Sequence, residues 1–139
     1  MTFFFFFFFF KNDTEYVLFG IPWDYLTSID LPDSAIAPEK IREVTQNLAL
    51  TTELGFKIPD FKLVDLGDVK IEAQGQYVKQ IIKNIEEFIH EIYKEKQNLI
   101  LIMIGGDHFC SYPVIETVGK SLTKTEDFGV LIFDAHLDF

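Results

Sequence analysis

The amino-acid sequence predicts a single α/β unit built on an open parallel sheet. Short apolar runs alternate along the chain with stretches whose apolar residues recur at helical spacing. The run Leu99–Ile104 is apolar throughout, which is typical of a strand buried on both faces of a parallel sheet. Polar residues follow this run and a later one directly, and open α/β folds bind their ligands at that edge of the sheet.

Four strands are expected from the apolar runs. The first ends at a proline and the second at Gly67, and both residues interrupt regular structure. No internal repeat or linker-like stretch separates the runs. The predicted strands are Tyr16–Ile21, Phe61–Leu66, Leu99–Ile104 and Val130–Phe133.

Three helices are expected between the strands. Pro38 is suited to the first turn of a helix that continues over Glu39–Leu50. The clearest pattern is Gln76–Lys96, whose apolar residues form one stripe with Lys and Glu on the other face. A further helix is predicted over Pro113–Leu122. Alternation of strands and helices predicts crossover connections between parallel strands.

Composition excludes several classes of protein. The 139 residues carry a net charge of −10 and are 48% hydrophobic, so general disorder is excluded. Nucleic-acid binders need a basic surface, and this chain is acidic. A single cysteine excludes both a disulfide framework and a cysteine-based zinc site.

The N-terminus contains eight consecutive phenylalanines, Phe3–Phe10. This run is less than half of what a membrane-spanning helix needs, and no basic residue precedes it as in a secretory signal. We expect residues 1–11 to lie outside the fold and residues 12–139 to form part of one domain. We also expect a cytoplasmic protein with no membrane partner.

The first motif with chemical potential is Ile104–His108, which follows a predicted strand. Its two glycines allow a sharp turn and a close approach of the backbone to a ligand. Asp107 and His108 would then point into the crevice at the carboxyl edge of the sheet. The alternative is an ordinary strand–helix turn with His108 as a capping or exposed residue.

The second motif is Asp134–Asp138, which follows the last predicted strand. In extended backbone Asp134, His136 and Asp138 share one side, which gives two carboxylates and an imidazole for a divalent cation. Mixed oxygen and nitrogen ligands favour Mn, Zn or Fe. A solvated acidic tail is the alternative. A parallel sheet would place His108 beside this cluster.

Together, Gly105–His108 and Asp134–Asp138 resemble the first two metal signatures of the ureohydrolases, the arginase and agmatinase family. Upstream, Phe19–Asp24, Ala37–Arg42 and Asp65–Asp68 resemble family segments, more those of the agmatinase branch. The similarity extends over the whole chain after the phenylalanine run.

The resemblance implies a three-layer α/β/α sandwich with a parallel sheet and a site for two Mn²⁺ ions. His108, Asp134 and Asp138 would bind one ion, while Asp134 and His136 would bind the second. Asp107 would orient a ligand or the hydroxide. Paired cations lower the pKa of a bridging water, which would attack a guanidino carbon and release urea and an amine. Agmatine is the expected substrate.

The third metal signature of the family is not found in these residues, and nothing follows the last predicted strand except residues 134–139. We therefore expect a fragment truncated at the C-terminus, with weak or single-metal binding and little turnover alone. A homo-oligomer is possible for the full-length parent. The alternative is an inactive or split-enzyme subunit whose partner chain supplies the missing ligands. A metal-independent phosphate-binding protein using Gly105 and Gly106 is a third hypothesis.

Three other features of the sequence have expected roles. Cys110 is expected to be a small buried residue at a helix start, because no second base is placed to activate it as a nucleophile. Trp23 either lines the site entrance or packs. The acidic residues Glu86, Glu87 and Glu91 are expected on a solvated helix face.

Overall fold

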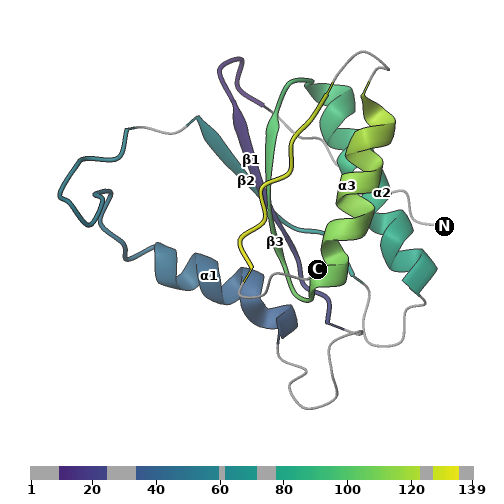
Figure 1. Cartoon of the computed structure of the whole chain (residues 1–139), viewed down its shortest axis with the longest axis horizontal. Coiled ribbons are helices and arrows are strands. Elements are labelled where there is room, and N and C mark those ends of the chain that lie inside the picture. The colour runs from purple at the N-terminus through teal and green to yellow at the C-terminus, as the bar shows by residue number, and fades with distance from the viewer. Residues whose placement is uncertain (1–9, 25–33, 60–61, 72–77, 123–126, 135–139) are drawn as a thin grey trace.

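A computed structural model describes residues 10–24, 34–59, 62–71, 78–122 and 127–134 (Figure 1). Strands and helices alternate along these residues, as the sequence predicts. The elements are β1 (Tyr16–Ile21), α1 (Ala37–Thr45), β2 (Leu63–Asp68), α2 (Val78–Glu95), β3 (Ile100–Gly105) and α3 (Ser111–Ser121), with 3-10 turns at Ser34–Ile36 and His108–Cys110. No helix in the described ranges is long and apolar enough to span a bilayer.

The three strands form a parallel sheet in the order β2-β1-β3. Tyr16 of β1 lies opposite Leu63 of β2 and Ile100 of β3, so the carboxyl ends of the strands meet at one edge. Since parallel neighbours need crossover connections, α1 and α2 lie in the two links between strands. The predicted parallel α/β architecture is confirmed.

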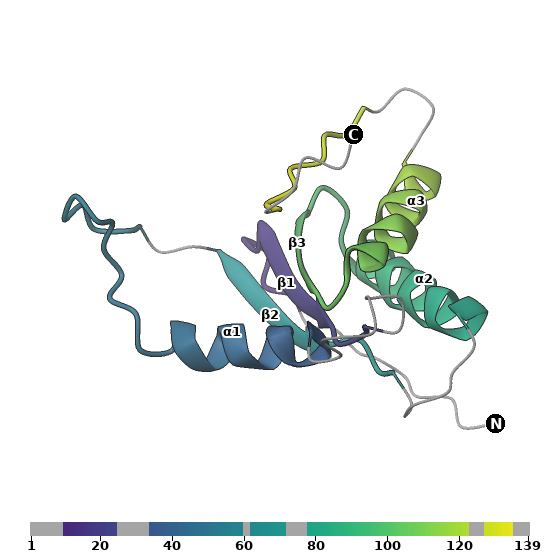
Figure 2. The ribbon, with the colours of Figure 1, turned by 60° about the horizontal axis from the view of Figure 1, so that its bottom comes forward.

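One face of the sheet is covered by α2 and α3 (Figures 1 and 2). Val17, Phe19 and Ile21 alternate along β1 and are fully buried beneath these helices. The predicted apolar stripe of α2 is also buried, and Phe88 lies with its ring centroid 5.4 Å from that of Phe19. The core of the described chain is therefore the interface between β1 and α2.

Among the described elements, only α1 lies on the other face, on the opposite side of the sheet from α2 and α3 (Figure 2). A side chain at Gly20 would collide with Pro38 of α1, so the helix packs directly on the carboxyl end of β1. Further along this face, Leu63, Ile100 and Ile102 remain 42%, 55% and 40% exposed. The prediction that Leu99–Ile104 is buried on both faces is wrong for Ile100 and Ile102, because no described element covers that part of the sheet.

Several boundaries also differ from the predictions. The helix predicted over Glu39–Leu50 ends at Thr45, and the exposed residues beyond it form an irregular arm. The second strand begins at Leu63 and continues to Asp68, while Phe61 lies outside the described residues. The last helix begins at Ser111, which places Pro113 in its first turn.

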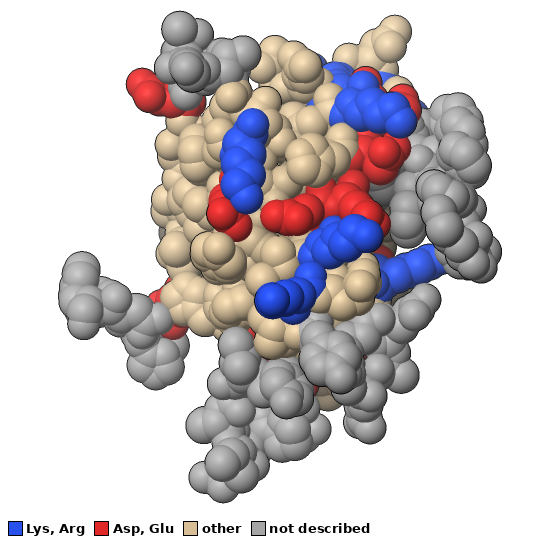
Figure 3. Space-filling model, turned by 90° about the vertical axis from the view of Figure 1, so that its right-hand side faces the viewer, with Lys and Arg blue, Asp and Glu red and all other residues tan. Residues whose placement is uncertain are grey.

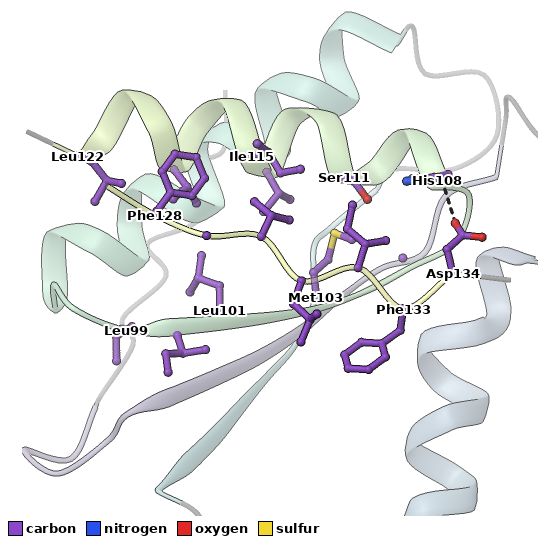
Figure 4. Close-up of a pocket in the computed structure, with 18 of the residues that line it drawn as sticks. Leu99, Leu101, Met103, His108, Ser111, Ile115, Leu122, Phe128, Phe133 and Asp134 are labelled. Carbon is purple, nitrogen blue, oxygen red and sulfur yellow. Dashed lines mark ion pairs between the residues drawn. The ribbon is translucent and has the colours of Figure 1, made fainter. Parts of the chain in front are cut away.

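The strand predicted over Val130–Phe133 does not form. These residues have no regular secondary structure, although they follow an extended path beside β3 (Figure 4). A strand requires ladder hydrogen bonds as well as an apolar pattern, and a cavity separates this segment from β3. The apolar pattern alone does not show whether a segment forms hydrogen bonds with a neighbouring strand.

The phenylalanine run falls largely outside the described residues. Only Phe10 is described, and it packs partly against the core. The assignment of residues 1–11 to a segment outside the fold therefore stays a prediction.

Candidate metal centre at the carboxyl edge of the sheet

The turn after β3 packs tightly against the chain that leaves β1. Gly106 donates its N–H to the carbonyl of Ile21 at 3.0 Å, and Asp107 donates to the carbonyl of Trp23 at 2.9 Å. A Cβ atom at Gly106 would lie 2.0 Å from the carbonyl oxygen of Trp23. Glycine is therefore required here by the approach of two backbones, as the motif predicts.

This turn places Asp107 and His108 at the carboxyl edge of the sheet. Asp107 is 7% exposed and has extended backbone, and His108 begins the 3-10 turn that leads into α3. The two adjacent side chains thus occupy different environments, one buried and one open to solvent. The expected role of Asp107, to orient a metal ligand or the hydroxide, stays a prediction.

His108 and Asp134 come together across the edge of the sheet (Figure 4). Nδ1 of His108 lies 3.0 Å from Oδ2 of Asp134, and the two side chains are 45% and 26% exposed. In the sequence, the two motifs that contain them lie on either side of α3. His136 and Asp138 fall outside the described residues, so their positions stay predictions.

The chemistry of this pair fits a divalent cation. The separation between Nδ1 and Oδ2 is that of an ion pair or hydrogen bond. Imidazole and carboxylate are also ligands that suit Mn or Zn. No cluster of three or more His, Cys, Asp or Glu able to hold a metal occurs within the described ranges. The described part thus supplies two of the four expected ligands.

A cavity of about 610 Å³ extends from this pair along β3. Its walls are β3, α3 and the 128–134 segment, which comprises Phe128–Asp134 (Figure 4). Most of the lining is apolar, and His108 and Asp134 lie at one end (Figure 4). The candidate metal ligands therefore border a cavity that separates β3 from the chain beyond α3.

Cys110 is a buried residue directly before α3, as predicted. Burial raises the pKa of its thiol to about 12, and the neighbouring Asp107 carboxylate adds to the shift. Its sulfur lies 3.6 Å from Oδ1 of Asp107 and 3.7 Å from the carbonyl oxygen of Trp23. A neutral, enclosed thiol is a poor nucleophile.

Trp23 packs against the protein. The residue is 7% exposed, and its ring meets that of Phe109 edge-on at a centroid distance of 5.2 Å. Phe109 in turn lies 5.8 Å from Tyr112. Of the two alternatives for Trp23, the structure supports packing.

Arg42 joins α1 to the end of β2 in a contact that the sequence motifs did not reveal. Its guanidinium donates to both carboxylate oxygens of Asp65, at 2.7 and 2.9 Å, and also to Asp68. Hydrogen bonding to Asp65 raises the pKa of Arg42 further. Burial raises the pKa of Asp65, but hydrogen bonds from Arg42 and from the N–H of Gly67 outweigh it, so this pKa is lowered. The sequence contained one indication of a special role for this residue, because Arg42 is the only arginine of the chain.

The outer face of α2 and α3 carries alternating charges (Figure 3). Lys83 lies 3.4 Å from Glu87 on α2, and Lys120 of α3 lies 3.0 Å from Glu116 and 3.8 Å from Glu86. Lys83 and Glu87 are exposed, as the prediction of a solvated face requires, whereas Glu86 and Glu91 are partly buried. Exposed pairs of this kind add little stability.

The fold and the paired ligands define a parallel α/β protein with candidate metal-binding residues at the carboxyl edge of its sheet. Residues 14–139 match the Arginase family, and the chain belongs to that family. It is 30% identical over 127 residues to an agmatinase of Pyrococcus horikoshii, covering 91% of this chain and 41% of that protein. Arginase 2 of Arabidopsis thaliana is 32% identical over 127 residues, with 87% of this chain and 36% of that protein covered.

Solved structures support the same fold. The arginase from Medicago truncatula superposes with a TM-score of 0.63 at 32% identity, covering 76% of this chain and 34% of that one. The chain therefore has an arginase-like α/β fold over part of its relatives' length. It spans about two fifths of the curated relatives described above.

Proposed function

We propose that this chain is the N-terminal part of a manganese-dependent ureohydrolase that converts a guanidino compound, agmatine first among candidates, into urea and an amine. The observation that carries the proposal is the 3.0 Å approach of His108 to Asp134 at the carboxyl edge of the sheet. Family membership supports the reaction class. The similarity to an agmatinase supports agmatine, and the similarity to a plant arginase makes arginine the substrate to compare.

In the proposed site His108, Asp134 and Asp138 would hold one Mn²⁺, and Asp134 and His136 would hold the second. Bound divalent cations would lower the pKa of a water molecule enough to supply hydroxide near neutral pH. Asp107 is proposed to orient that group through hydrogen bonds. Two cations carry four positive charges, whereas Asp134 and Asp138 supply two negative ones. We therefore expect weak or single-ion binding by this chain alone.

Calorimetric titration with Mn²⁺ tests the metal part of the proposal. We expect no more than one weakly bound ion per chain, and strongly reduced binding in His108→Ala. His90→Ala is the matched control, because His90 is exposed on α2. Two tightly bound ions per chain would contradict the expected incomplete ligand set. Unchanged binding in His108→Ala would remove His108 from the site.

Urea release tests the reaction. The 139-residue chain is expected to release little urea from agmatine or arginine in the presence of Mn²⁺. An arginase-like protein that contains this segment and the remaining ligands is expected to release urea from agmatine in preference to arginine. Preference for arginine would reject agmatine as the substrate. Urea release that does not depend on Mn²⁺ would reject the metal mechanism.

A second candidate is a subunit that needs a separate chain for the remaining ligands. The exposed apolar residues Leu63, Ile100 and Ile102 favour it, since they lie on the sheet face where α1 is the one helix in the described part of the chain. Purification of the protein from its source at its native mass tests this candidate. A stoichiometric partner with carboxylate ligands would support it, and a single chain of about twice the mass would reject it.

We further propose a cytoplasmic location and assembly of the complete protein from identical subunits. Cell fractionation and native mass measurement test these two points.

A further inference from the structure

Lys96 connects the end of α2 to the turn over residues 11–14, which precedes β1. The residue directly follows α2, and its side chain crosses to the turn. Its Nζ donates to the carbonyl oxygens of Thr14 and Asn12 at 2.7 and 2.8 Å, and to that of Lys11 at 3.4 Å. Two segments that are far apart in the sequence thus meet at a single ammonium group.

The three carbonyl oxygens of the 11–14 turn face one point in space, since all three contact the same nitrogen. The N–H of Thr14 donates to the carbonyl of Lys11 at 3.1 Å and closes the turn. Thr14 is 4% exposed, so a carbonyl without a partner there would be costly. A lysine ammonium has three N–H donors and no acceptor, and three carbonyl oxygens match that capacity.

The ammonium of Lys96 is held by neutral oxygens. Within the described part of the chain it pairs with no carboxylate, and Glu15, which follows the turn, pairs instead with Lys62 at 2.7 Å. Backbone carbonyls that converge on one point can replace the hydration shell of a monovalent cation. The turn therefore has the properties of a site for a small cation that donates hydrogen bonds.

We propose that the 11–14 turn is a binding site for a primary alkylammonium group, that Lys96 fills it from within the chain, and that this contact holds the start of the fold against α2. The tethered lysine is present at high effective concentration and therefore excludes free amines. The proposal does not depend on the proposed function, because the turn precedes β1 and the candidate metal centre lies at the carboxyl ends of the strands.

Replacement of the lost group by a free amine tests the proposal in the full chain. Lys96→Ala removes three methylene groups and the ammonium, and n-propylammonium supplies the same atoms. The amide of Thr14 is expected to exchange its hydrogen at least about tenfold faster in Lys96→Ala, because the turn loses its charged hydrogen-bond donor. Addition of about 100 mM n-propylammonium should slow this exchange again at least about threefold. Nuclear magnetic resonance measures the rates.

Two controls make the result specific. Tetramethylammonium has the same charge but no N–H donor, so it should not slow the exchange. Lys94→Ala is the matched variant, because the side chain of Lys94 is 69% exposed on α2 and pairs with Glu91 of the same helix. In this variant the amide of Thr14 should exchange as in the unmodified chain, with or without n-propylammonium.

Acetylation of the unmodified chain tests the same contact without any variant. Lys96 is partly buried and must leave the turn before its amine can react. In the folded chain Lys96 is therefore expected to react with an acetylating reagent at least about fivefold more slowly than Lys94. The two rates should become equal in guanidinium chloride. Mass spectrometry of the peptides measures both rates.

Each result supports or overturns one part of the proposal. Unchanged exchange of Thr14 in Lys96→Ala would show that the contact does not hold the turn. Failure of n-propylammonium to slow the exchange, or equal slowing by tetramethylammonium, would overturn the ammonium site. Equal acetylation of Lys96 and Lys94 in the folded chain would show that Lys96 does not fill the site. None of these results bears on Mn²⁺ binding or urea release.

Discussion

At Gly106 the backbones of two loops approach so closely that no side chain fits between them. The contact partners are backbone atoms of Trp23, which cannot rotate away as a side chain can. Gly119 lies in α3, where an added Cβ would meet only the ring of Phe128 at ordinary contact distance. The two glycines therefore differ in what they contribute to stability.

Gly106→Ala is expected to destabilise the fold by roughly 3 kcal/mol or more, because the turn must separate from Trp23. Gly119→Ala is expected to be neutral or to stabilise by up to about 1 kcal/mol, since alanine favours helix. Urea unfolding followed by circular dichroism measures both. Equal stability of the two variants would mean that the Gly106 turn does not hold the loops together.

The thiol of Cys110 is expected to react slowly with a disulfide reagent at pH 8. Burial raises its pKa to about 12, so the reactive thiolate is scarce in the folded chain. The unfolded thiol, with a pKa of about 8.5, should react about a thousandfold faster. Rates in buffer and in guanidinium chloride measure the ratio. Fast reaction of the folded chain would show that Cys110 is accessible and ionised.

Among the elements, α1 depends on polar side-chain contacts more than α2 does, because α2 is held mainly by apolar burial. Its only buried residue is Pro38, whereas five apolar residues of α2 are buried. The forked contact of Arg42 with Asp65 and Asp68 therefore anchors α1 to β2. Because α1 begins beside Gly20, this anchor also fixes the helix at the carboxyl edge of the sheet.

Arg42→Gln is expected to lower the free energy of unfolding by about 1 to 2 kcal/mol at pH 7. The pKa of Asp65 is lowered in the fold, so its carboxylate stabilises the protein above its unfolded pKa of about 3.9. This contribution is lost as the pH falls through the lowered value, and the variant should show less of that loss. Urea unfolding between pH 7 and pH 3 measures it.

Lys40→Gln is the control for this prediction. Lys40 lies on the same helix and pairs with Glu43, but both side chains are well exposed. The control should change stability by less than about 0.5 kcal/mol. If both variants behave alike, the contact of Arg42 does not anchor α1.

Local sequence patterns best predicted the elements whose apolar residues are buried in the core. The stripe of α2 and the apolar run of β1 are both found within two residues of their predicted bounds. Val130–Phe133 has the same apolar pattern but needs a ladder partner, which the pattern cannot specify. The Arg42 contact joins residues more than 20 positions apart, so spacing alone did not reveal it. The approach of His108 to Asp134 was predicted on the assumption that both follow parallel strands, and it is found although Val130–Phe133 forms no strand.

At the scale of the whole molecule, the two faces of the sheet differ. One is covered by α2 and α3, and the other leaves Leu63, Ile100 and Ile102 partly exposed beside α1. Exposed apolar side chains that lie together on a flat sheet favour association between molecules. The relatives are more than twice as long as this chain, which is consistent with further covering elements in the family.

The isolated chain is expected to self-associate as its concentration rises. Replacing Ile100 and Ile102 by threonine keeps the preference for strand but removes apolar surface, and should weaken association about tenfold. Leu54→Thr, in the arm after α1, should have a smaller effect. Sedimentation velocity over a range of concentrations measures this. A monomer at all concentrations would show that this face does not drive association.

The central position of β1 also determines when the protein can fold on the ribosome. Val17, Phe19 and Ile21 emerge early, yet their neighbours in β3 and α2 are made much later, since Tyr16 pairs with Ile100. At roughly 5 to 20 residues per second, the first strand waits on the order of 10 s for its second partner. During that interval a nascent chain exposes an apolar strand whose partners have not yet been made, and exposed apolar surface of this kind favours aggregation.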